Sequence, residues 1–154
     1  MEELRALLGR FPTGVAVVTV VAGGQVLGLT VGSLVRLSLG PPLVGCAISR
    51  QAALHELLRE AGGCTVSLLS AGQEAVAEHF ARGVPPIGMW EGIATESGVG
   101  GAPRLSGALG WLECAVETEV AAGTHTFFVC AVVAAEAGIA DRALTRARGS
   151  YANI

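Results

Sequence analysis

The stretch Gly28-Leu29-Thr30-Val31-Gly32-Ser33-Leu34-Val35-Arg36-Leu37-Ser38-Leu39-Gly40-Pro41-Pro42 contains the features that decide the fold of this chain. It begins as an apolar strand, admits small polar side chains and a glycine, and ends in a turn. Glycine inside a strand packs nothing, so it usually marks a bulge or a close approach by another group. The Thr30 and Ser33 hydroxyls and nearby backbone N–H groups are suited to hydrogen-bond a flat ligand with polar edges. A strand-end bulge in an all-β core is an equally good interpretation.

Composition and charge describe one globular domain, residues 1–154. A chain of 154 residues with 51% hydrophobic residues can build a sizeable core. Only 15% of the residues are charged and the net charge is −3, which argues against a nucleic-acid partner. A positive mean hydropathy with 5% aromatic residues indicates that apolar surface is hidden between subunits as well as inside one.

The sequence predicts neither a targeting signal nor a membrane segment. Residues 2–8 have the pattern of a short amphipathic helix with acidic residues in its first turn, not of a signal peptide. No apolar stretch reaches the roughly 20 residues that span a bilayer. We therefore expect a soluble, cytoplasmic protein without a membrane partner.

The four cysteines, Cys46, Cys64, Cys114 and Cys130, each lie inside an apolar run. They form no Cys-x-x-Cys pair, and no histidine neighbours them at the spacing of metal ligands. We expect them to be buried small hydrophobic residues and predict no metal site and no disulfide.

Hydrophobic patterning predicts strands arranged in hairpins, with two short helices inserted between them. A β-branched run over residues 15–21, a turn at Gly23-Gly24 and a returning strand over residues 26–39 give the first hairpin. Because strands and helices do not alternate regularly, the pattern favours a closed antiparallel β-barrel with helical insertions. The other predicted elements are strands over residues 43–48, 64–69, 108–122 and 125–133 and helices over residues 49–60 and 71–80.

The predicted strand over residues 108–122 alternates clearly. Leu112 and Cys114 fall on one face, and Trp111 and Glu113 on the other. The pattern predicts one core face and one face that meets water or a partner.

The Gly- and Pro-rich residues 81–107 predict a long irregular segment, which suggests a lid or a partner-contacting loop. Its Gly98-Val99-Gly100-Gly101 run is not a dinucleotide fingerprint, because no predicted strand precedes it and no helix follows.

The predicted helix over residues 49–60 begins at Ser49, a suitable N-cap. A helix start presents unpaired N–H groups and the positive end of the dipole, so an anion can bind there beside Arg50. A capped surface helix with a solvated Arg50 is the alternative. His55 and His79 fall on predicted helices and are expected to be solvated.

A set of short motifs resembles those of the flavin reductase-like, FMN-binding split-barrel proteins. Each motif is weak by itself, but seven in register make a specific match that covers nearly the whole chain from Phe11 to Tyr151. The motifs begin with Arg10-Phe11-Pro12-Thr13-Gly14-Val15-Ala16-Val17-Val18-Thr19, Gly28-Leu29-Thr30-Val31-Gly32-Ser33 and Leu37-Ser38-Leu39-Gly40-Pro41-Pro42-Leu43-Val44. They continue with Gly101-Ala102-Pro103-Arg104-Leu105, Gly107-Ala108-Leu109-Gly110-Trp111-Leu112-Glu113-Cys114, Gly123-Thr124-His125-Thr126-Phe127-Phe128-Val129 and Arg148-Gly149-Ser150-Tyr151.

The resemblance implies a mainly β, homodimeric split barrel of Greek-key type with short inserted helices, which binds FMN or FAD at the dimer interface. It implies an NAD(P)H:flavin oxidoreductase that transfers hydride from NADH or NADPH to flavin N5. Reduced flavin then reaches a partner monooxygenase by diffusion. A flavin-binding or redox-sensing dimer without appreciable turnover is the alternative, and a structural barrel with an empty site is a third hypothesis.

The resemblance also implies site residues. The segment from Thr30 to Ser33 lies along the isoalloxazine and ribityl groups, the helix start at Ser49 lies near the phosphate, and His125 is the catalytic residue that contacts the nicotinamide. A plain strand-end histidine is the alternative for His125. Arg50 is expected at the phosphate, and Arg36 is either a second charge near the flavin or a surface residue. The implied cofactor-binding residues are Leu29, Thr30, Val31, Gly32, Ser33, Ser49, Arg50, Gln51 and Tyr151.

Three positions depart from the family pattern. Gly32 stands where relatives often carry Asn, so only backbone groups would contact flavin there. Thr124 stands where Gly-Asp-His is common, so His125 lacks a carboxylate to orient it. Leu54 or Ala53 replaces a hydroxyl residue near the phosphate. Together these departures predict a low affinity for flavin.

Overall fold

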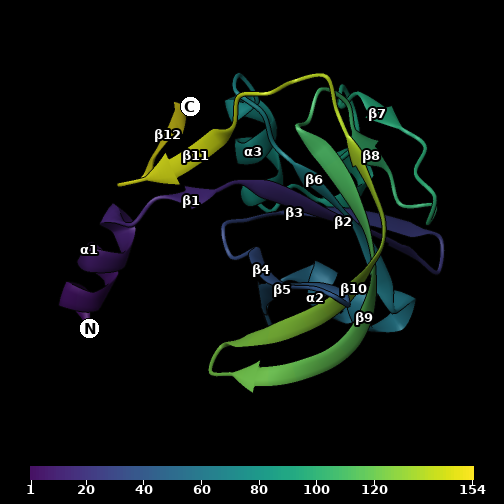
Figure 1. Cartoon of the computed structure of the whole chain (residues 1–154), viewed down its shortest axis with the longest axis horizontal. Helices are drawn as coiled ribbons and strands as arrows, with labels where there is room; N and C mark the ends of the chain where they lie inside the picture. Colours follow the sequence, from purple (N-terminus) through teal and green to yellow (C-terminus); the bar gives the residue numbers. More distant parts are fainter.

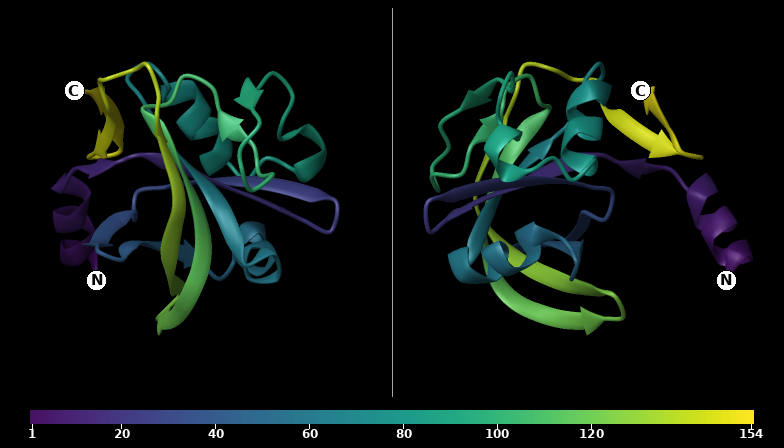
Figure 2. Two further views of the ribbon diagram at one scale, coloured as in Figure 1. Left: turned by 45° about the vertical axis from the view of Figure 1, so that its right-hand side comes forward. Right: turned by 180° about the vertical axis from the view of Figure 1, so that it is seen from behind.

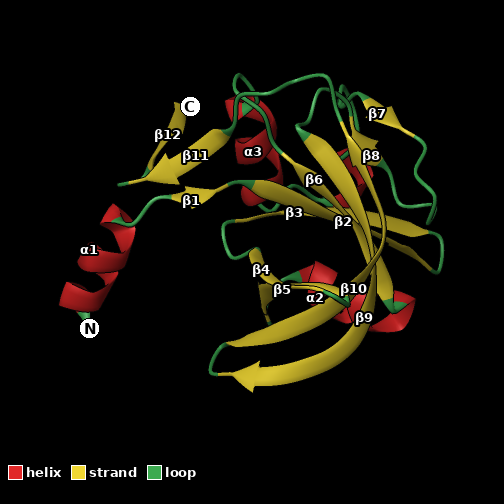
Figure 3. Cartoon of the chain, in the orientation of Figure 1, coloured by secondary structure: helices red, strands yellow, loops and turns green.

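The computed structural model describes residues 1–154, which form a mainly β fold with one strongly curved sheet (Figures 1 and 3). The sheet has the strand order β3-β2-β6-β9-β10-β5-β4 and is antiparallel throughout. The mainly β class is thus confirmed. Its strands are β2 (Ala16–Ala22), β3 (Gln25–Val31), β4 (Val35–Leu39), β5 (Pro42–Ser49), β6 (Gly63–Leu68), β9 (Gly110–Ala122) and β10 (His125–Ala137).

The stretch that opens the sequence analysis joins the two edges of this sheet. The predicted single strand over residues 26–39 is wrong, because the chain leaves β3 at Val31 and enters β4 at Val35. β3 and β4 are the two edge strands, yet four residue steps connect them, a reach of at most about 14 Å. The sheet must therefore curl until its edges approach each other.

The prediction of a closed barrel is corrected by the ladder pattern. No backbone ladder joins β3 to β4 or β5, so the sheet is not closed by main-chain hydrogen bonds. Instead the Ser33 hydroxyl donates to the Ala47 carbonyl (2.8 Å) and accepts from the Ala47 N–H (3.0 Å). One side chain thus bridges the end of β3 to β5.

Helix α2 (Ala53–Ala61) packs Leu54, Leu57 and Leu58 into the core, as the leucine spacing predicts. The predicted start at Ser49 is wrong. Ser49 is the last residue of β5, directly opposite His125 of β10, and the next N–H, that of Arg50, donates to the Thr124 carbonyl. These strand contacts hold the chain extended, so the helix begins only after Ala52.

The remaining helix of the core region, α3 (Glu74–Ala81), begins later than the predicted residue 71. Its Phe80 is buried against β3 at Gly28, where an added Cβ would lie 2.7 Å from the Phe80 ring. Gly28 is therefore required for close packing of a helix side chain on this strand. The predicted hairpin turn is also present, with φ of 56° at Gly23 and 80° at Gly24.

The segment from residue 82 to residue 107 is mostly irregular, as predicted, and contains η1 (Pro86–Gly88), β7 (Thr95–Glu96) and β8 (Arg104–Leu105). It is fixed to the sheet at both ends. The Trp90 indole N–H donates to the Val26 carbonyl (2.8 Å), and the Thr19 hydroxyl donates to the Pro103 carbonyl (2.7 Å).

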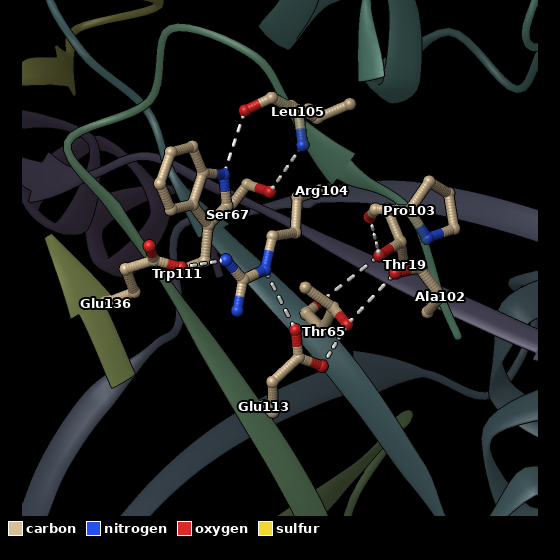
Figure 4. A network of polar contacts seen from close by, with 10 residues as sticks. All are labelled: Thr19, Thr65, Ser67, Ala102, Pro103, Arg104, Leu105, Trp111, Glu113 and Glu136. Carbon is tan, nitrogen blue, oxygen red and sulfur yellow. Dashed lines mark hydrogen bonds and ion pairs between the residues drawn. The ribbon is translucent and has the colours of Figure 1, made fainter. Parts of the chain in front are cut away.

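A buried ion-pair network fastens the second part of this segment (Figure 4). The Arg104 Nε donates to Glu113 Oε1 (3.1 Å), and the Thr65 hydroxyl donates to Glu113 Oε2 (2.6 Å). Arg104 also pairs with Glu136. Glu113 is 2% exposed within the chain, so the prediction that its face meets water or a partner is wrong there. Glu113 is buried because the irregular segment covers this face of β9, and strand periodicity does not predict that cover.

Helix α1 (Glu2–Arg10) projects from the body and buries none of its residues (Figures 1 and 2). Its apolar side chains form one stripe, made of Leu4, Leu7, Leu8 and the following Phe11, each at least half exposed. It leads into a small sheet of order β1-β11-β12. These strands are β1 (Thr13–Gly14), β11 (Leu144–Ala147) and β12 (Ser150–Asn153).

All four cysteines are free and buried, as predicted. Cys64 of β6 lies directly opposite Cys114 of β9 in the ladder. Burial raises the pKa of the Cys46 thiol to about 11. Hydrogen bonding to Cys114 and Cys130, together with burial, raises the pKa of Cys64. Raised pKa values keep these two thiols protonated.

The prediction that both helix histidines are solvated is wrong for His55, which is buried, whereas His79 is half-buried. His55 is 4% exposed, its Nε2 lies 2.8 Å from the Thr126 hydroxyl, and its ring meets Phe128 edge-on. His79 Nε2 lies 2.5 Å from the Met89 carbonyl. Both pack between a helix and another element, which helical periodicity alone cannot predict.

Candidate functional site

A cavity of about 370 Å³, here called the first cavity, opens where the ends of β3 and β5 meet the start of β10. Its lining residues come from distant parts of the sequence, from Leu29 to His125. Most of the predicted site residues line it, together with Ala47 and Ala52. The predicted residues among its lining are Leu29, Thr30, Val31, Gly32, Ser33, Ser49 and His125.

Three predicted residues do not line the first cavity. Arg50 is exposed just beyond β5, and Gln51 follows it and lines a neighbouring cavity. Tyr151 lies on β12, in the small sheet, with its ring 4.8 Å from the Arg146 guanidinium. Arg36, on β4, is also outside the first cavity and is exposed.

The free edge of β3 turns backbone groups toward the first cavity. In an antiparallel pair, alternate residues direct their N–H and C=O groups to the neighbouring strand. The Gly28 N–H donates to the Met89 sulfur (3.3 Å) and the Val26 carbonyl accepts from Trp90, so both face away from β2. Thr30 has the same parity. Its N–H and C=O groups therefore face the open edge.

The side chains of this stretch are used differently from expectation. The Thr30 hydroxyl donates to the Ala77 carbonyl of α3 (2.6 Å), and the Ser33 hydroxyl bridges to Ala47. The close approach at Gly32 comes from Thr13, whose hydroxyl oxygen would lie 2.8 Å from an added Cβ. The Thr30 and Ser33 hydroxyls are therefore satisfied within the chain, and within this stretch the backbone is the remaining source of donors for a ligand.

Ser33→Ala is expected to destabilise the fold by about 2 kcal/mol, because it leaves the Ala47 N–H and C=O without their partner at the seam between β3 and β5. Urea denaturation measures the loss. Ser150→Ala, at an exposed position of β12, is the matched control and should change stability by less than about 0.5 kcal/mol. Equal losses in the two variants would show that the bridge does not hold the seam.

His125 stands at the rim of the first cavity and is exposed. Its Nδ1 lies 2.9 Å from the hydroxyl oxygen of Thr124, which leaves Nε2 as the free ring nitrogen. The sequence analysis noted the missing carboxylate at residue 124 but not that threonine supplies a hydrogen bond in its place. This hydrogen bond could have been predicted from the sequence, because a threonine hydroxyl directly precedes the imidazole of His125.

The start of α2 offers a site for an anion beside the first cavity. The N-cap residue Ala52 lines the cavity, and no side chain caps the helix. The N–H groups of Ala53 and Leu54 and the positive end of the helix dipole are therefore available to a negative group, whereas the His55 N–H donates to the Ala52 carbonyl. Arg50 precedes this turn by two positions and adds a positive charge nearby.

The structure gathers no group of three or more His, Cys, Asp or Glu side chains suited to hold a metal ion. None of its helices has both the length and the apolar character needed to cross a membrane.

Comparison with known protein families decides the family. Residues 8–154 match the family described as flavin reductase like domain. This chain belongs to the flavin reductase-like domain family. The resemblance inferred from the motifs is confirmed, and the match extends over both the curved sheet and the small sheet.

Curated relatives of this flavin reductase-like chain are similar over most of its length. It is 40% identical to an NADH-dependent FAD reductase of Streptomyces globisporus, over 86% of this chain and 74% of the relative. It is 43% identical to the reductase component of 4-hydroxyphenylacetate 3-monooxygenase of Thermus thermophilus, over 89% and 85%.

A solved structure also aligns closely with this family member. The Streptomyces globisporus NADH:FAD oxidoreductase, in complex with NAD and FAD fragments, superposes with a TM-score of 0.91 at 36% identity. The alignment covers 98% of this chain and 90% of that one.

Proposed function

We propose that this protein is an NAD(P)H:flavin oxidoreductase that supplies reduced flavin to a separate monooxygenase. The observation that carries the proposal is the first cavity, where the free edge of β3, the start of α2 and His125 meet. Family membership and the reductases among its relatives support the same activity.

The residues of the first cavity fit a flavin. The isoalloxazine ring is flat and has polar atoms along one edge, and the outward N–H and C=O of Thr30 offer partners for that edge. Leu29 and Val31 add apolar groups to the lining, and Ser49 adds a hydroxyl. The uncapped start of α2, with Arg50 nearby, fits the phosphate. Gln51 follows Arg50 on the same approach.

When bound, the flavin supplies the hydride-accepting chemistry, so the protein's part is to hold two rings face to face and exclude competing reactions. In this proposal His125 would donate or accept a hydrogen bond at the nicotinamide carboxamide through Nε2, the ring nitrogen that Thr124 leaves free. Thr124 fixes the ring orientation of His125 by holding Nδ1. An exposed rim position suits a nucleotide that must enter and leave with each turnover.

The proposal includes a homodimeric split barrel. The apolar stripe of α1 has no partner within the chain, which supports burial against a second copy. A groove of about 520 Å³ along β4, β5 and β10 is also mostly apolar, with Leu37, Leu43 and Val132 in its lining. Because Tyr151 lies outside the first cavity of its own chain, its role toward flavin is proposed to be across the dimer interface.

The activity test is flavin-dependent oxidation of NADH or NADPH, measured by loss of nucleotide absorbance with FMN and with FAD. We expect turnover with at least one nucleotide and one flavin. Flavin binding without nucleotide oxidation would support a flavin-binding dimer without turnover instead. Absence of flavin binding at any concentration would reject both functions.

His125→Ala is expected to raise the KM for the nicotinamide nucleotide about tenfold, the effect of losing one hydrogen bond of about 1.4 kcal/mol. The Kd for flavin should change less than about twofold, because the backbone of β3 and the start of α2 are unaltered. Steady-state kinetics and fluorescence titration measure the two quantities. Thr118→Ala, at an exposed position on β9, is the control. Equal loss of both affinities would reject this role for His125.

A further inference from the structure

His55 is a buried polar side chain with one ring nitrogen left unpaired. It lies in the first turn of α2 and is 4% exposed. Its Nε2 lies 2.8 Å from the Thr126 hydroxyl oxygen, but its Nδ1 is buried without a hydrogen-bond partner. An oxygen of the exposed Glu56 carboxylate lies 3.4 Å from Nδ1 and makes no hydrogen bond to it. A buried polar atom without a partner calls for a physical explanation.

The surroundings of His55 are otherwise those of an apolar core position. The other buried residues of α2 are Leu54, Leu57 and Leu58, and the imidazole ring packs edge-on against Phe128. A leucine at residue 55 would fill this place without burying an unpaired nitrogen. The contact that a leucine could not make is the hydrogen bond of Nε2. The distinct contribution of His55 is therefore its bond to Thr126.

This bond joins two walls of the first cavity. On one side, Ala52 lines the cavity and precedes His55 by three positions, so the bond holds the first turn of α2. On the other side, the buried Thr126 directly follows His125 on β10. Because successive residues of a strand point to opposite faces, a bond that fixes Thr126 on the buried face also fixes the direction in which His125 points.

The rest of α2 is fixed to other strands. Its body packs on β2, β3 and β6 rather than on β10. The turn that joins β5 to α2 contains the exposed residues Arg50 and Gln51. A second polar contact runs from α2 to the β9–β10 hairpin, with Arg59 Nε 3.0 Å from Glu119 Oε1, but it lies at the opposite end of the helix and is partly exposed. His55 is therefore the residue that fixes the start of α2 relative to β10.

We propose that His55 is a positioning residue for hydride transfer: its hydrogen bond to Thr126 sets the distance between the anion site at the start of α2 and His125. This inference rests on the proposed function, in which a flavin phosphate binds at α2 and His125 contacts the nicotinamide. Reacting rings must lie about 3–3.5 Å apart and aligned, and a displacement of about 1 Å can lower the rate about a hundredfold. A flavin held by its phosphate therefore depends on the position of α2 for its alignment.

His55→Leu and Thr126→Val each remove the hydrogen bond and keep an apolar side chain of similar size. Each should lower kcat about tenfold at saturating substrates, measured with FMN or FAD, whichever gives turnover. His55→Gln, whose amide can hydrogen-bond to the Thr126 hydroxyl, and Thr126→Ser, which keeps the hydroxyl, should retain most of the wild-type kcat. Arg59→Ala is the control, because it removes the contact at the other end of α2, and it should change kcat less than about twofold.

Riboflavin separates positioning from structural support. It has the isoalloxazine and ribityl groups but no phosphate, so its alignment does not depend on the start of α2. The kcat with riboflavin should therefore be the same in His55→Leu and Thr126→Val as in wild type, whereas a general loss of structure would lower turnover with every flavin. Urea denaturation establishes that each variant is folded under the assay conditions, and Thr126→Val replaces His55→Leu if the latter does not fold.

Wild-type kcat with the phosphorylated flavin in His55→Leu and Thr126→Val would overturn the inference while the oxidoreductase activity stands. Equal losses with phosphorylated flavin and riboflavin, or equal losses in Thr126→Ser and Thr126→Val, would also overturn it and leave His55 a purely structural role. If wild type does not turn over riboflavin, the kcat values of His55→Gln and Thr126→Ser decide. If wild type oxidises neither NADH nor NADPH with any flavin, the proposed function itself fails.

Discussion

Glu113→Ala is expected to destabilise the protein by about 3 kcal/mol, because it leaves the buried Arg104 guanidinium with one partner and the Thr65 hydroxyl with a lost acceptor. Glu113 is 2% exposed and Arg104 6%, so water cannot replace the missing carboxylate. The remaining partner, Glu136, is mostly solvent-exposed and holds only one arm of the guanidinium. Urea denaturation of the full chain measures the effect.

Glu117→Ala is the matched control, since Glu117 lies on the same strand, four residues further on, but is exposed. It should change stability by less than about 0.5 kcal/mol. Thr65→Val should reproduce part of the loss, because it removes the hydroxyl that donates to Glu113. If Glu113→Ala and Glu117→Ala were equally mild, the network would not be what fastens residues 102–105 to the sheet.

The double variant Leu4→Asp/Leu8→Asp is expected to weaken the proposed homodimer by at least about a hundredfold in Kd, because it puts charges on the apolar stripe of α1 in both copies. The helix buries nothing in its own chain, so the fold should be unaffected. Analytical ultracentrifugation measures the monomer–dimer equilibrium, and urea denaturation checks the fold. Val99→Asp/Ile139→Asp, at two exposed apolar residues elsewhere, is the control.

The same variant tests where the flavin lies. If Tyr151 reaches the flavin across the interface, the monomer should bind flavin at least about tenfold more weakly, as expected for loss of an aromatic contact. If the monomeric variant bound flavin as tightly as wild type, the proposed dimer would stand, but the proposed role of Tyr151 in flavin binding would be rejected. A wild-type protein that is already monomeric at micromolar concentration would reject the dimer.

The elements with strong local signals could be predicted from the sequence. The β-branched run of β2, the Gly23-Gly24 turn and the leucine face of α2 each depend on neighbouring residues, and each is present in the structure. Part of the first cavity could also be predicted, because the stretch from Leu29 to Ser33 has small polar side chains and a glycine, which a core strand would not have.

What could not be predicted depends on contacts between distant residues. Ser49 has the chemistry of an N-cap, but pairing with His125 keeps it in a strand. Glu113 falls on a polar face by periodicity, but residues 98–104, nine to fifteen positions earlier, cover it. Ser33 and Thr30 are suited to a ligand, yet both hydroxyls bond to backbone carbonyls far along the chain. Local pattern gives the residue types available, and the tertiary fold decides which of them remain free.

The buried thiols have a consequence for the chemistry of released flavin. Free reduced flavin reacts with dioxygen and yields hydrogen peroxide, so an enzyme of this class works beside a source of oxidant. Peroxide attacks thiolates, and Cys46 and Cys64 are buried and held protonated. Cys114 and Cys130 are buried in the same core, although hydrogen bonding to Cys64 lowers the pKa of Cys130. Burial, which keeps peroxide away from all four sulfur atoms, is therefore what protects these cysteines from conversion to sulfenic acid during aerobic turnover.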